Sequence, residues 1–298
     1  MNAAFRIGVT GVNGQVGRAI KELSEQFPEA KWTFLDREGL DLSDSAHIEA
    51  HFAEHQYTHF INCAAYTAVD KAEEEIQLAD QINHQSVAII AQQCAQQNTV
   101  LIQLSSDYVY HNGIDRPLLE TDPTQPQGVY AKTKLLGDQA ALTHNPSTII
   151  LRTSWVYAPL GKNFVHTMLR LGQDRESLKV VFDQVGTPTY APHLAQAILD
   201  IIKSPVMTEN PAEWSGIYHF SNEGVTSWYD FAISIFSLAA IDCQVFPITS
   251  AEYPTPAQRP TYSVLNKAKI KQRFDLSIPH WHTGLANCLQ TISLTSSF

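Results

Sequence analysis

Short apolar runs alternate with longer segments in which apolar residues recur every three or four positions through the first half of the chain. Continuous apolar runs are typical of strands buried on both faces of a sheet, and the longer spacing is typical of amphipathic helices. The expected strands cover residues 5–11, 31–36, 58–65 and 99–106, and the expected helices cover residues 15–27, 45–56 and 78–97. This alternation predicts an α/β fold, a doubly wound parallel sheet with helices on both faces.

The second half of the chain departs from this alternation after about Pro159. A helix over residues 130–142 and a strand over residues 147–154 still continue the first pattern, as do a helix over 191–203 and a strand over 216–222. Segments 163–174, 178–183, 227–240 and the Pro-rich 249–260 need not join the same sheet. We therefore predict a nucleotide-binding domain of residues 1–158 plus about 185–223, and a smaller interleaved C-terminal substrate lobe of about 159–184 plus 224–298.

Composition and charge narrow the class of protein. With 298 residues, 44% hydrophobic and 17% charged, the chain can bury a large core, which excludes a disordered protein. A net charge of -10 gives no attraction for phosphate backbones or anionic lipid, so neither nucleic acid nor membrane is an expected partner. The apolar runs are too short to span a bilayer and the start lacks a signal-peptide pattern, so a cytoplasmic location is expected. The four cysteines are scattered, and we expect reduced, mostly buried thiols.

A glycine-rich turn follows the first strand and leads directly into the first helix. Glycines at positions 11, 14 and 17 let the backbone bend sharply and expose N–H groups at the positive end of the helix. That arrangement favours a dinucleotide pyrophosphate, held at Gly11, Asn13, Gly14, Gln15 and Val16. The alternative is a glycine-rich turn that binds nothing.

The end of the second strand carries Asp36 and Arg37. An acid here can accept from the ribose 2'-hydroxyl of NAD, whereas an Arg can pair with the 2'-phosphate of NADP. Having both leaves the choice of cofactor open. Asp41 and Leu42 are candidates for contact with the adenine, although Asp41 is equally suited to cap a helix.

A candidate acid-base group lies on the helix expected over residues 130–142. Tyr130 and Lys134 are spaced i, i+4 on one helix face, and Ser106 ends the fourth strand. A free phenol has a pKa of about 10, and we expect the Lys134 cation to lower it. Tyr130 would then exchange a proton with a carbonyl oxygen that the Ser106 hydroxyl also contacts. The alternative makes these residues a half-buried Tyr, a solvated Lys and a strand-end cap.

Six stretches resemble the extended short-chain dehydrogenase/reductases and, within them, the dTDP-4-dehydrorhamnose reductases. They are residues 14–17, 62–73, 106–110, 152–157, 163–164 and 254–260, so that the resemblance covers nearly the whole chain. It implies a Rossmann fold and reduction of the C4 ketone of a nucleotide-sugar substrate, dTDP-4-dehydro-L-rhamnose. NADPH would be the reductant, with NADH also possible. Tyr130 would be the proton donor, Lys134 would also hold the nicotinamide ribose, and Ser106 stands where the family commonly has Thr.

The same matching implies roles for further residues. Asp107, Tyr108 and Trp155 would shape the sugar pocket, and Asn163 and Arg259 would lie near the nucleotide diphosphate. Ala64, Ala65 and Tyr66 would line the cofactor groove, and Asn83 would be a buried structural or relay residue. Some members form a magnesium-bridged dimer, but Ala19 and the acid-free segment 187–192 replace two expected glutamates. No metal is therefore expected, and we predict a monomer or weak homodimer.

Several alternatives stay open at this point. A 4,6-dehydratase is disfavoured because Asp107 is followed by Tyr108 rather than by the Glu that elimination requires. Reductases of other nucleotide-linked keto sugars fit almost as well, and a related chain serves as the non-catalytic subunit of methionine adenosyltransferase. His47, His51, His55 and His59 form an i, i+4 ladder, which we interpret as a surface feature without a structural metal.

Overall fold

A six-stranded parallel sheet forms the centre of the computed structural model, which describes residues 5–111 and 113–295. The outermost residues of the two predicted domains, 1–4 and 296–298, lie outside the described residues, as does Asn112. The strands are β1 (Phe5–Thr10), β2 (Ala30–Leu35), β3 (His59–Asn62), β4 (Val100–Ser106), β5 (Thr148–Thr153) and β10 (Gly216–His219). Their order is β10-β5-β4-β3-β1-β2, and every pairing is parallel. The predicted doubly wound sheet is thereby confirmed, and its strand order reverses beside β1, where ligands of such sheets bind.

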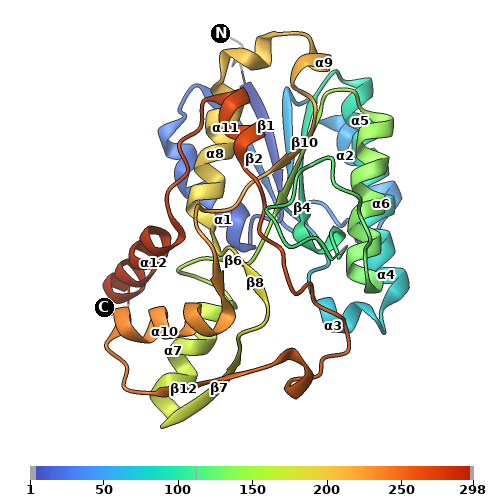
Figure 1. Cartoon of the computed structure of the whole chain (residues 1–298). Coiled ribbons are helices and arrows are strands. Elements are labelled where there is room, and N and C mark those ends of the chain that lie inside the picture. Colours follow the sequence, from blue (N-terminus) through green and yellow to red (C-terminus); the bar gives the residue numbers. More distant parts are fainter. Residues whose placement is uncertain (1–4, 112, 296–298) are drawn as a thin grey trace.

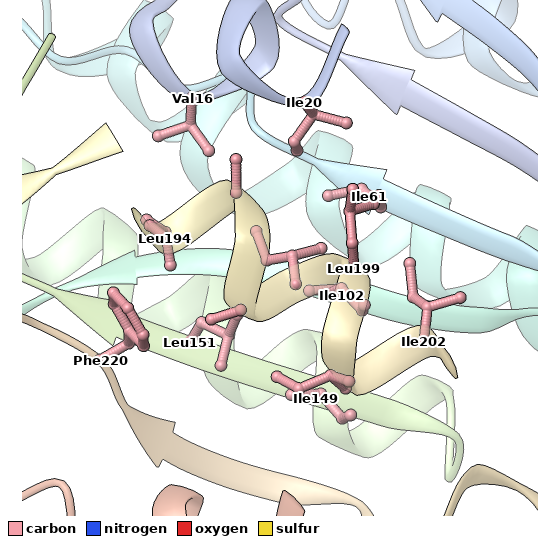
Figure 2. Packing of buried hydrophobic residues seen from close by; sticks show 14 of the residues in the cluster. Val16, Ile20, Ile61, Ile102, Ile149, Leu151, Leu194, Leu199, Ile202 and Phe220 are labelled. Atoms are coloured by element: carbon pink, nitrogen blue, oxygen red, sulfur yellow. The ribbon is translucent and has the colours of Figure 1, made fainter. Parts of the chain in front are cut away.

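Helices cover both faces of the sheet (Figure 1). One face carries α1 (Gln15–Leu23) and α8 (Ala191–Lys203), and the other carries α2 (Ser45–Glu54), α5 (Ser86–Gln96) and α6 (Gly128–His144). Neighbouring strand residues face opposite sides, so that Ile61 packs toward α1 and α8 while Phe60 packs toward α2. Figure 2 shows the first of these cores, where α8 lies across the middle strands. Each fully buried aliphatic side chain there contributes about 1.5–3 kcal/mol to folding.

A second lobe lies beyond the carboxyl ends of the strands, in the lower part of Figure 1. It contains α7 (Phe164–Asp174), β7 (Ser177–Val181), α10 (Trp228–Ala239) and β12 (Gln244–Ile248), with β7 and β12 paired in parallel. These elements and α12 (Trp281–Thr295) share their own apolar core. Two further pairs of short strands lie outside the large sheet. They are β6 (Val156–Tyr157) with β9 (Thr189–Tyr190), and β8 (Val185–Gly186) with β11 (Thr226–Ser227).

Two details differ from the sequence-based expectation. The helix expected over residues 78–97 is interrupted: α4 (Ile76–Asp80) runs into a π-helical turn, η2 (Gln81–Gln85), before α5 begins. Helix α11 (Ala268–Phe274), which the predicted boundaries assign to the second lobe, packs against β10, because Ile270 and Phe274 join the core under the large sheet. The rest of the predicted division stays a prediction. The remaining short elements are η1 (Ser24–Gln26), α3 (Val69–Ala72), η3 (Asp107–Val109), η4 (Pro205–Thr208), α9 (Pro211–Trp214) and η5 (Ser250–Glu252).

The cysteines and the helix lengths bear on the expected class of protein. All four cysteines are free thiols, with Cys94 and Cys288 buried and Cys63 and Cys243 partly exposed. Among the residues that the structure describes, no helix is long and apolar enough to cross a membrane.

Candidate active site

The glycine-rich turn after β1 has the tight geometry that its sequence predicts. Gly11 has a φ of +67°, and the Gly14 N–H donates to the Gly11 carbonyl at 2.8 Å. A Cβ atom at position 17 would lie 2.3 Å from the Gly11 oxygen, which no side chain tolerates. Gly14 caps α1 without a side-chain hydrogen bond, so the first N–H groups of the helix face the turn. A phosphate group fits this cradle in charge and in space.

A cavity of about 490 Å³ opens at this turn. Nine predicted residues line it: Gly11, Asn13, Gly14, Gln15, Val16, Ala64, Ala65, Tyr130 and Lys134. The sequence interpretation missed ten others: Arg18, Cys63, Thr67, Leu104, Ser105, Thr153, Val156, Leu160, Gly161 and Lys162. Of these residues, Arg18 was predictable from the sequence, because it lies one turn into α1, where a cation can reach an anion at the start of the helix. Lys162 lies in a loop, and no motif around it indicates that it reaches the cavity.

Five predicted cofactor residues lie outside the walls of this cavity. Asp36 Oδ1 accepts the N–H groups of Glu38 and Gly39 at 3.1 and 3.0 Å, so this carboxylate stabilises its own turn. The Arg37 side chain is 78% exposed, and its Nε lies 3.6 Å from Asp41 Oδ2. Leu42 is buried, and the Tyr66 hydroxyl donates to Glu75 at 2.6 Å. Their contact with a cofactor stays a prediction.

Helix α6 brings Tyr130 and Lys134 to the wall of the cavity beside the end of β4. The Lys134 ammonium donates to the Leu104 carbonyl at 2.7 Å. Ser106 ends β4, and its hydroxyl is hydrogen-bonded to the Tyr130 phenol. The structure therefore brings the three predicted catalytic residues together.

The prediction that Lys134 lowers the pKa of Tyr130 is wrong, because the pKa is raised in the structure. Burial raises the pKa of the Tyr130 phenol to about 12, and the hydrogen bond between this phenol and Ser106 only partly offsets the rise. The negative charges of Asp107 and Asp138 raise it as well. The expectation rested on the Lys134 cation, whereas the loss of water around the buried phenol has the larger effect. Tyr130 is thus held as a protonated phenol, ready to donate.

Asp107 is a buried carboxyl next to this group. Its Oδ1 accepts from the Ser106 hydroxyl at 3.1 Å, and its Oδ2 makes no hydrogen bond to any residue that the structure describes. Burial raises the pKa of Asp107 to about 6, although Ser263 and Ser106 lower it through side-chain hydrogen bonds. A carboxyl with such a pKa exchanges its proton near neutral pH.

A second cavity of about 900 Å³ lies in the smaller lobe, where α7, β7, α10 and β12 form its walls. Tyr108 and Arg259, both predicted substrate residues, line it. Its other cations are Arg175 and Lys179, and its aromatic side chains are Tyr108, Phe164, Trp228, Phe246 and Tyr253. The Tyr108 and Tyr130 rings form an edge-to-face pair, with centroids 5.6 Å apart. The two cavities therefore approach each other at this pair of phenols.

Arg259 also links the two parts of the chain. Its guanidinium donates to both carboxylate oxygens of Asp70, at 3.1 and 2.8 Å. Asp70 belongs to α3, which packs against α6, and also accepts the Ala257 N–H at 3.2 Å. This bidentate pair ties the Pro-rich segment 249–260 to α3, and the sequence reasoning missed Asp70 as a wall of the second cavity.

The other predicted substrate residues are near these cavities but are not part of their walls. Asn163 Nδ2 donates to Gln15 Oε1 at 2.9 Å, and Asn163 Oδ1 caps α7. Trp155 has a φ of +49° and stacks on Trp228, with ring centroids 3.7 Å apart. Trp155 thus supports an aromatic wall of the second cavity, whereas Asp107 lies behind Ser106.

Asn83 is buried and lies in the π-helical turn. Its Oδ1 accepts the Tyr66 N–H at 2.9 Å, and its Nδ2 donates to the Tyr66 carbonyl at 3.1 Å. Asn83 therefore fixes the loop after β3, whose residues Ala64 and Ala65 line the first cavity.

The histidine ladder is not a surface ladder, which corrects the sequence interpretation. His51 and His59 are buried, because α2 packs His51 against the sheet and His59 begins β3. His51 Nε2 is hydrogen-bonded to the Tyr57 hydroxyl at 2.8 Å, and His55 Nδ1 to the His51 carbonyl oxygen at 2.9 Å. Within residues 5–111 and 113–295, no cluster of three His, Cys, Asp or Glu side chains is placed to hold a metal ion.

Comparison with known proteins places this chain among sugar-nucleotide enzymes. A family model described as RmlD substrate binding domain matches residues 5–294. A dTDP-4-dehydrorhamnose reductase from Aggregatibacter actinomycetemcomitans is 38% identical over 95% of this chain and 97% of its own length.

Solved structures agree with the sequence comparison. A dTDP-4-dehydrorhamnose reductase from Clostridium acetobutylicum superposes with a TM-score of 0.91 at 37% identity, over 97% of this chain and 99% of its own. One from Bacillus anthracis, in complex with NADP, has a TM-score of 0.90 at 33% identity, over 96% and 99%. These matches extend along nearly the full length of the chain in sequence and in fold, and the chain belongs to the dTDP-4-dehydrorhamnose reductase family.

Proposed function

We propose that this protein reduces the C4 ketone of dTDP-4-dehydro-L-rhamnose to the alcohol of dTDP-L-rhamnose, with NADPH as the reductant. The observation that carries the proposal is the position of Tyr130. This protonated phenol lines the glycine-rich cavity and touches Tyr108, which lines the larger cavity of the second lobe. A proton donor at the junction of two cavities is suited to a reaction between a dinucleotide in one and a second ligand in the other.

The glycine-rich cavity fits a nicotinamide dinucleotide. The turn at Gly11, Gly14 and Gly17 would take the pyrophosphate, with the Arg18 and Lys162 cations nearby. When bound, the reduced nicotinamide supplies a hydride to the substrate carbonyl. Lys134 would hold the ribose with the ammonium N–H groups that its bond to Leu104 leaves free.

The larger cavity suits a nucleoside diphosphate sugar in size and charge. Three cations, Arg175, Lys179 and Arg259, would face the diphosphate, and Phe246 and Tyr253 offer flat surfaces for a base. The ketone would lie at Tyr130, where the Ser106 hydroxyl donates a hydrogen bond to its oxygen. As the alkoxide forms at C4, Tyr130 transfers its phenolic proton to that oxygen. Donating to an alkoxide is feasible for a phenol with a raised pKa, because the alcohol formed is a much weaker acid still.

Arg37 supports NADPH over NADH. The Asp36 carboxylate is engaged by its own turn, whereas the Arg37 guanidinium is largely exposed at the end of β2 and can reach a 2'-phosphate. We therefore infer a modest preference for NADPH, with NADH also used. The expectation of a cytoplasmic monomer or weak homodimer stays a prediction within this proposal.

The test is oxidation of NADPH by the purified protein at 340 nm, with dTDP-4-dehydro-L-rhamnose generated in place and the product identified by mass and NMR. Turnover to dTDP-L-rhamnose is the expected result. GDP- and UDP-linked 4-keto sugars serve as matched controls, and faster turnover of either would reassign the substrate. Tight NADPH binding without turnover of any of the three would contradict the proposal and favour a regulatory, dinucleotide-binding role.

A further inference from the structure

Three charged side chains lie buried together behind the glycine-rich cavity. Lys134 and Asp138 stand one turn apart on α6, and Arg152 comes from β5, with exposed fractions of 3%, 1% and 2%. Arg152 Nε donates to Asp138 Oδ2 at 3.0 Å, and Lys134 Nζ donates to the Leu104 carbonyl at 2.7 Å. The Asp138 carboxylate thus pairs directly with Arg152 and lies one helical turn from Lys134, and all three side chains are shielded from solvent.

The Arg152 side of this cluster is held rigidly by neutral partners. Arg152 Nη1 donates to the Tyr110 hydroxyl at 2.5 Å, and that hydroxyl lies 2.8 Å from His219 Nε2. Burial lowers the pKa of His219 to about 3, so the ring is neutral and accepts from Tyr110 while its Nδ1 donates to the Leu118 carbonyl. Arg152 is therefore fixed from both ends, and it fixes the Asp138 carboxylate in turn.

Six further ionisable side chains surround this cluster. Besides the three residues themselves, the ionisable groups around it are Tyr130 on α6, Asp107 on η3, Tyr110, Glu120, His219 and Lys269. The Ser105 hydroxyl of β4 also lies near Asp138 and lowers the carboxyl pKa. Asp138 is the acid whose negative charge acts directly on Lys134.

The Lys134 amine needs a nearby negative charge to stay protonated. Burial lowers the pKa of Lys134 because an ammonium loses its water there, and the Asp138 carboxylate opposes that effect. Without the Asp138 carboxylate, Lys134 and Arg152 would be two buried cations that share no ion pair with a described residue, and the amine is the one that can release its proton. A neutral amine would still reach Leu104 but would no longer attract the electron-rich groups of a bound dinucleotide.

We propose that Asp138, anchored by Arg152, is a positioning residue that keeps the Lys134 amine protonated at the wall of the cofactor cavity. Asp138 itself lines neither cavity and acts through Lys134. The inference rests on the proposed function only in that the first cavity is taken to hold a nicotinamide dinucleotide.

The test measures the dissociation constant of NADPH by fluorescence titration between pH 6.5 and 9.5, so that it requires no turnover. In Asp138→Asn, we expect the alkaline loss of affinity to begin about one pH unit or more lower than in the parent protein. At pH 9 the affinity should fall about tenfold or more relative to the parent, and at pH 6.5 by less than about threefold. Asp138→Glu should restore the parent profile.

Two further variants separate this role from a merely structural one. Glu223→Gln is the matched control, because Glu223 pairs with the buried Lys267 at 3.5 Å, away from both cavities, and its profile should equal that of the parent. Arg152→Gln removes the anchor of Asp138 and the cation that opposes the rise in its pKa from burial, so the alkaline loss of affinity should again begin at lower pH than in the parent; this variant serves as the test if Asp138→Asn does not fold. A loss of affinity in Asp138→Asn that is equal at every pH, or an affinity profile that does not change with this substitution, would overturn the proposal. An NADPH profile that shifts as expected in Asp138→Asn, alongside no sugar reduction by the parent protein, would instead count against the proposed function alone.

Discussion

Tyr130 is the residue on which the proposed chemistry depends most directly. Replacing it by Phe removes only the hydroxyl that would donate the proton, while the ring keeps its contact with Tyr108. We expect Tyr130→Phe to lower kcat roughly a hundredfold or more and to leave NADPH affinity nearly unchanged. Tyr262→Phe, which loses a hydroxyl outside both cavities, is the control in the same NADPH oxidation assay. Near-parent turnover by Tyr130→Phe would dismiss this residue as the acid.

Asp107 makes a different prediction, about stability. Its pKa is about 6 in the folded protein against an ordinary value of 3.8, so the folded state holds a proton between these values that the unfolded state has lost. Stability from this group is therefore complete below about pH 4 and is lost as pH rises through 6. Asp107→Asn should be about 2 kcal/mol more stable than the parent at pH 7, and no more stable at pH 4. Urea unfolding at both pH values measures this; an equal difference at both would contradict it.

At the scale of elements, the turn before α1 predicts the most severe backbone effect. In Gly17→Ala the new methyl group would meet the Gly11 carbonyl oxygen at 2.3 Å, and both atoms belong to packed backbone. The turn must open to relieve this contact, which spoils the cradle and the packing of α1 on β1. We expect a loss of about 2 kcal/mol or more in the free energy of unfolding, with NADPH affinity at least about tenfold weaker. Gly39→Ala is the matched control, because its Cβ would meet its neighbours at ordinary distances of 3.4 Å and more.

The elements also show what the sequence allows one to predict. Strands β1 to β5 and the helices between them follow from apolar periodicity, because each buries a continuous run or a single face. The π-helical turn at residues 81–85 does not, since Asn83 leaves the α-helical pattern to bond the backbone of Tyr66, a partner 17 residues away. Likewise the place of α11 against β10 depends on a tertiary contact of Ile270 and Phe274, which apolar periodicity does not reveal.

The candidate site divides in the same way. Residues that belong to a local motif, such as the glycine turn and the Tyr130–Lys134 pair, are found from spacing alone. Asp70 and Lys162 carry no local signal, because each reaches its cavity from a loop or short helix whose position is set by the rest of the fold. The pKa of Tyr130 could not be predicted either, since it depends on burial, and burial is a property of the whole site.

At the scale of the whole molecule, three buried histidines set the response to acid. Burial lowers the pKa of His51 and of His59 to about 4 and that of His219 to about 3, against an ordinary value of 6.5. Between these values the unfolded chain binds protons that the folded protein cannot accept. The stability that these groups provide is therefore complete above about pH 6.5 and is lost as pH falls toward 4. Asp107, Glu120 and Asp138 act in the opposite direction, because burial raises the pKa of each of these carboxyls, whereas the Arg259 partner lowers the pKa of Asp70, which adds to the loss in acid.

The three buried histidines predict a steep loss of stability in mild acid, to which each of them makes a separate contribution. Near pH 5 each such histidine contributes up to about 1.4 kcal/mol per pH unit to the slope of the free energy of unfolding. His59→Leu removes one titrating ring from a site whose side-chain hydrogen bond is only to the neighbouring Thr58, so the slope should fall by about that amount. His282→Gln removes an exposed ring on α12 and should leave the slope unchanged. Urea unfolding of the three proteins at intervals between pH 4 and 7 gives the slopes directly. If His59→Leu and His282→Gln changed the slope equally, acid sensitivity would reside in the overall charge of the protein rather than in its buried imidazoles.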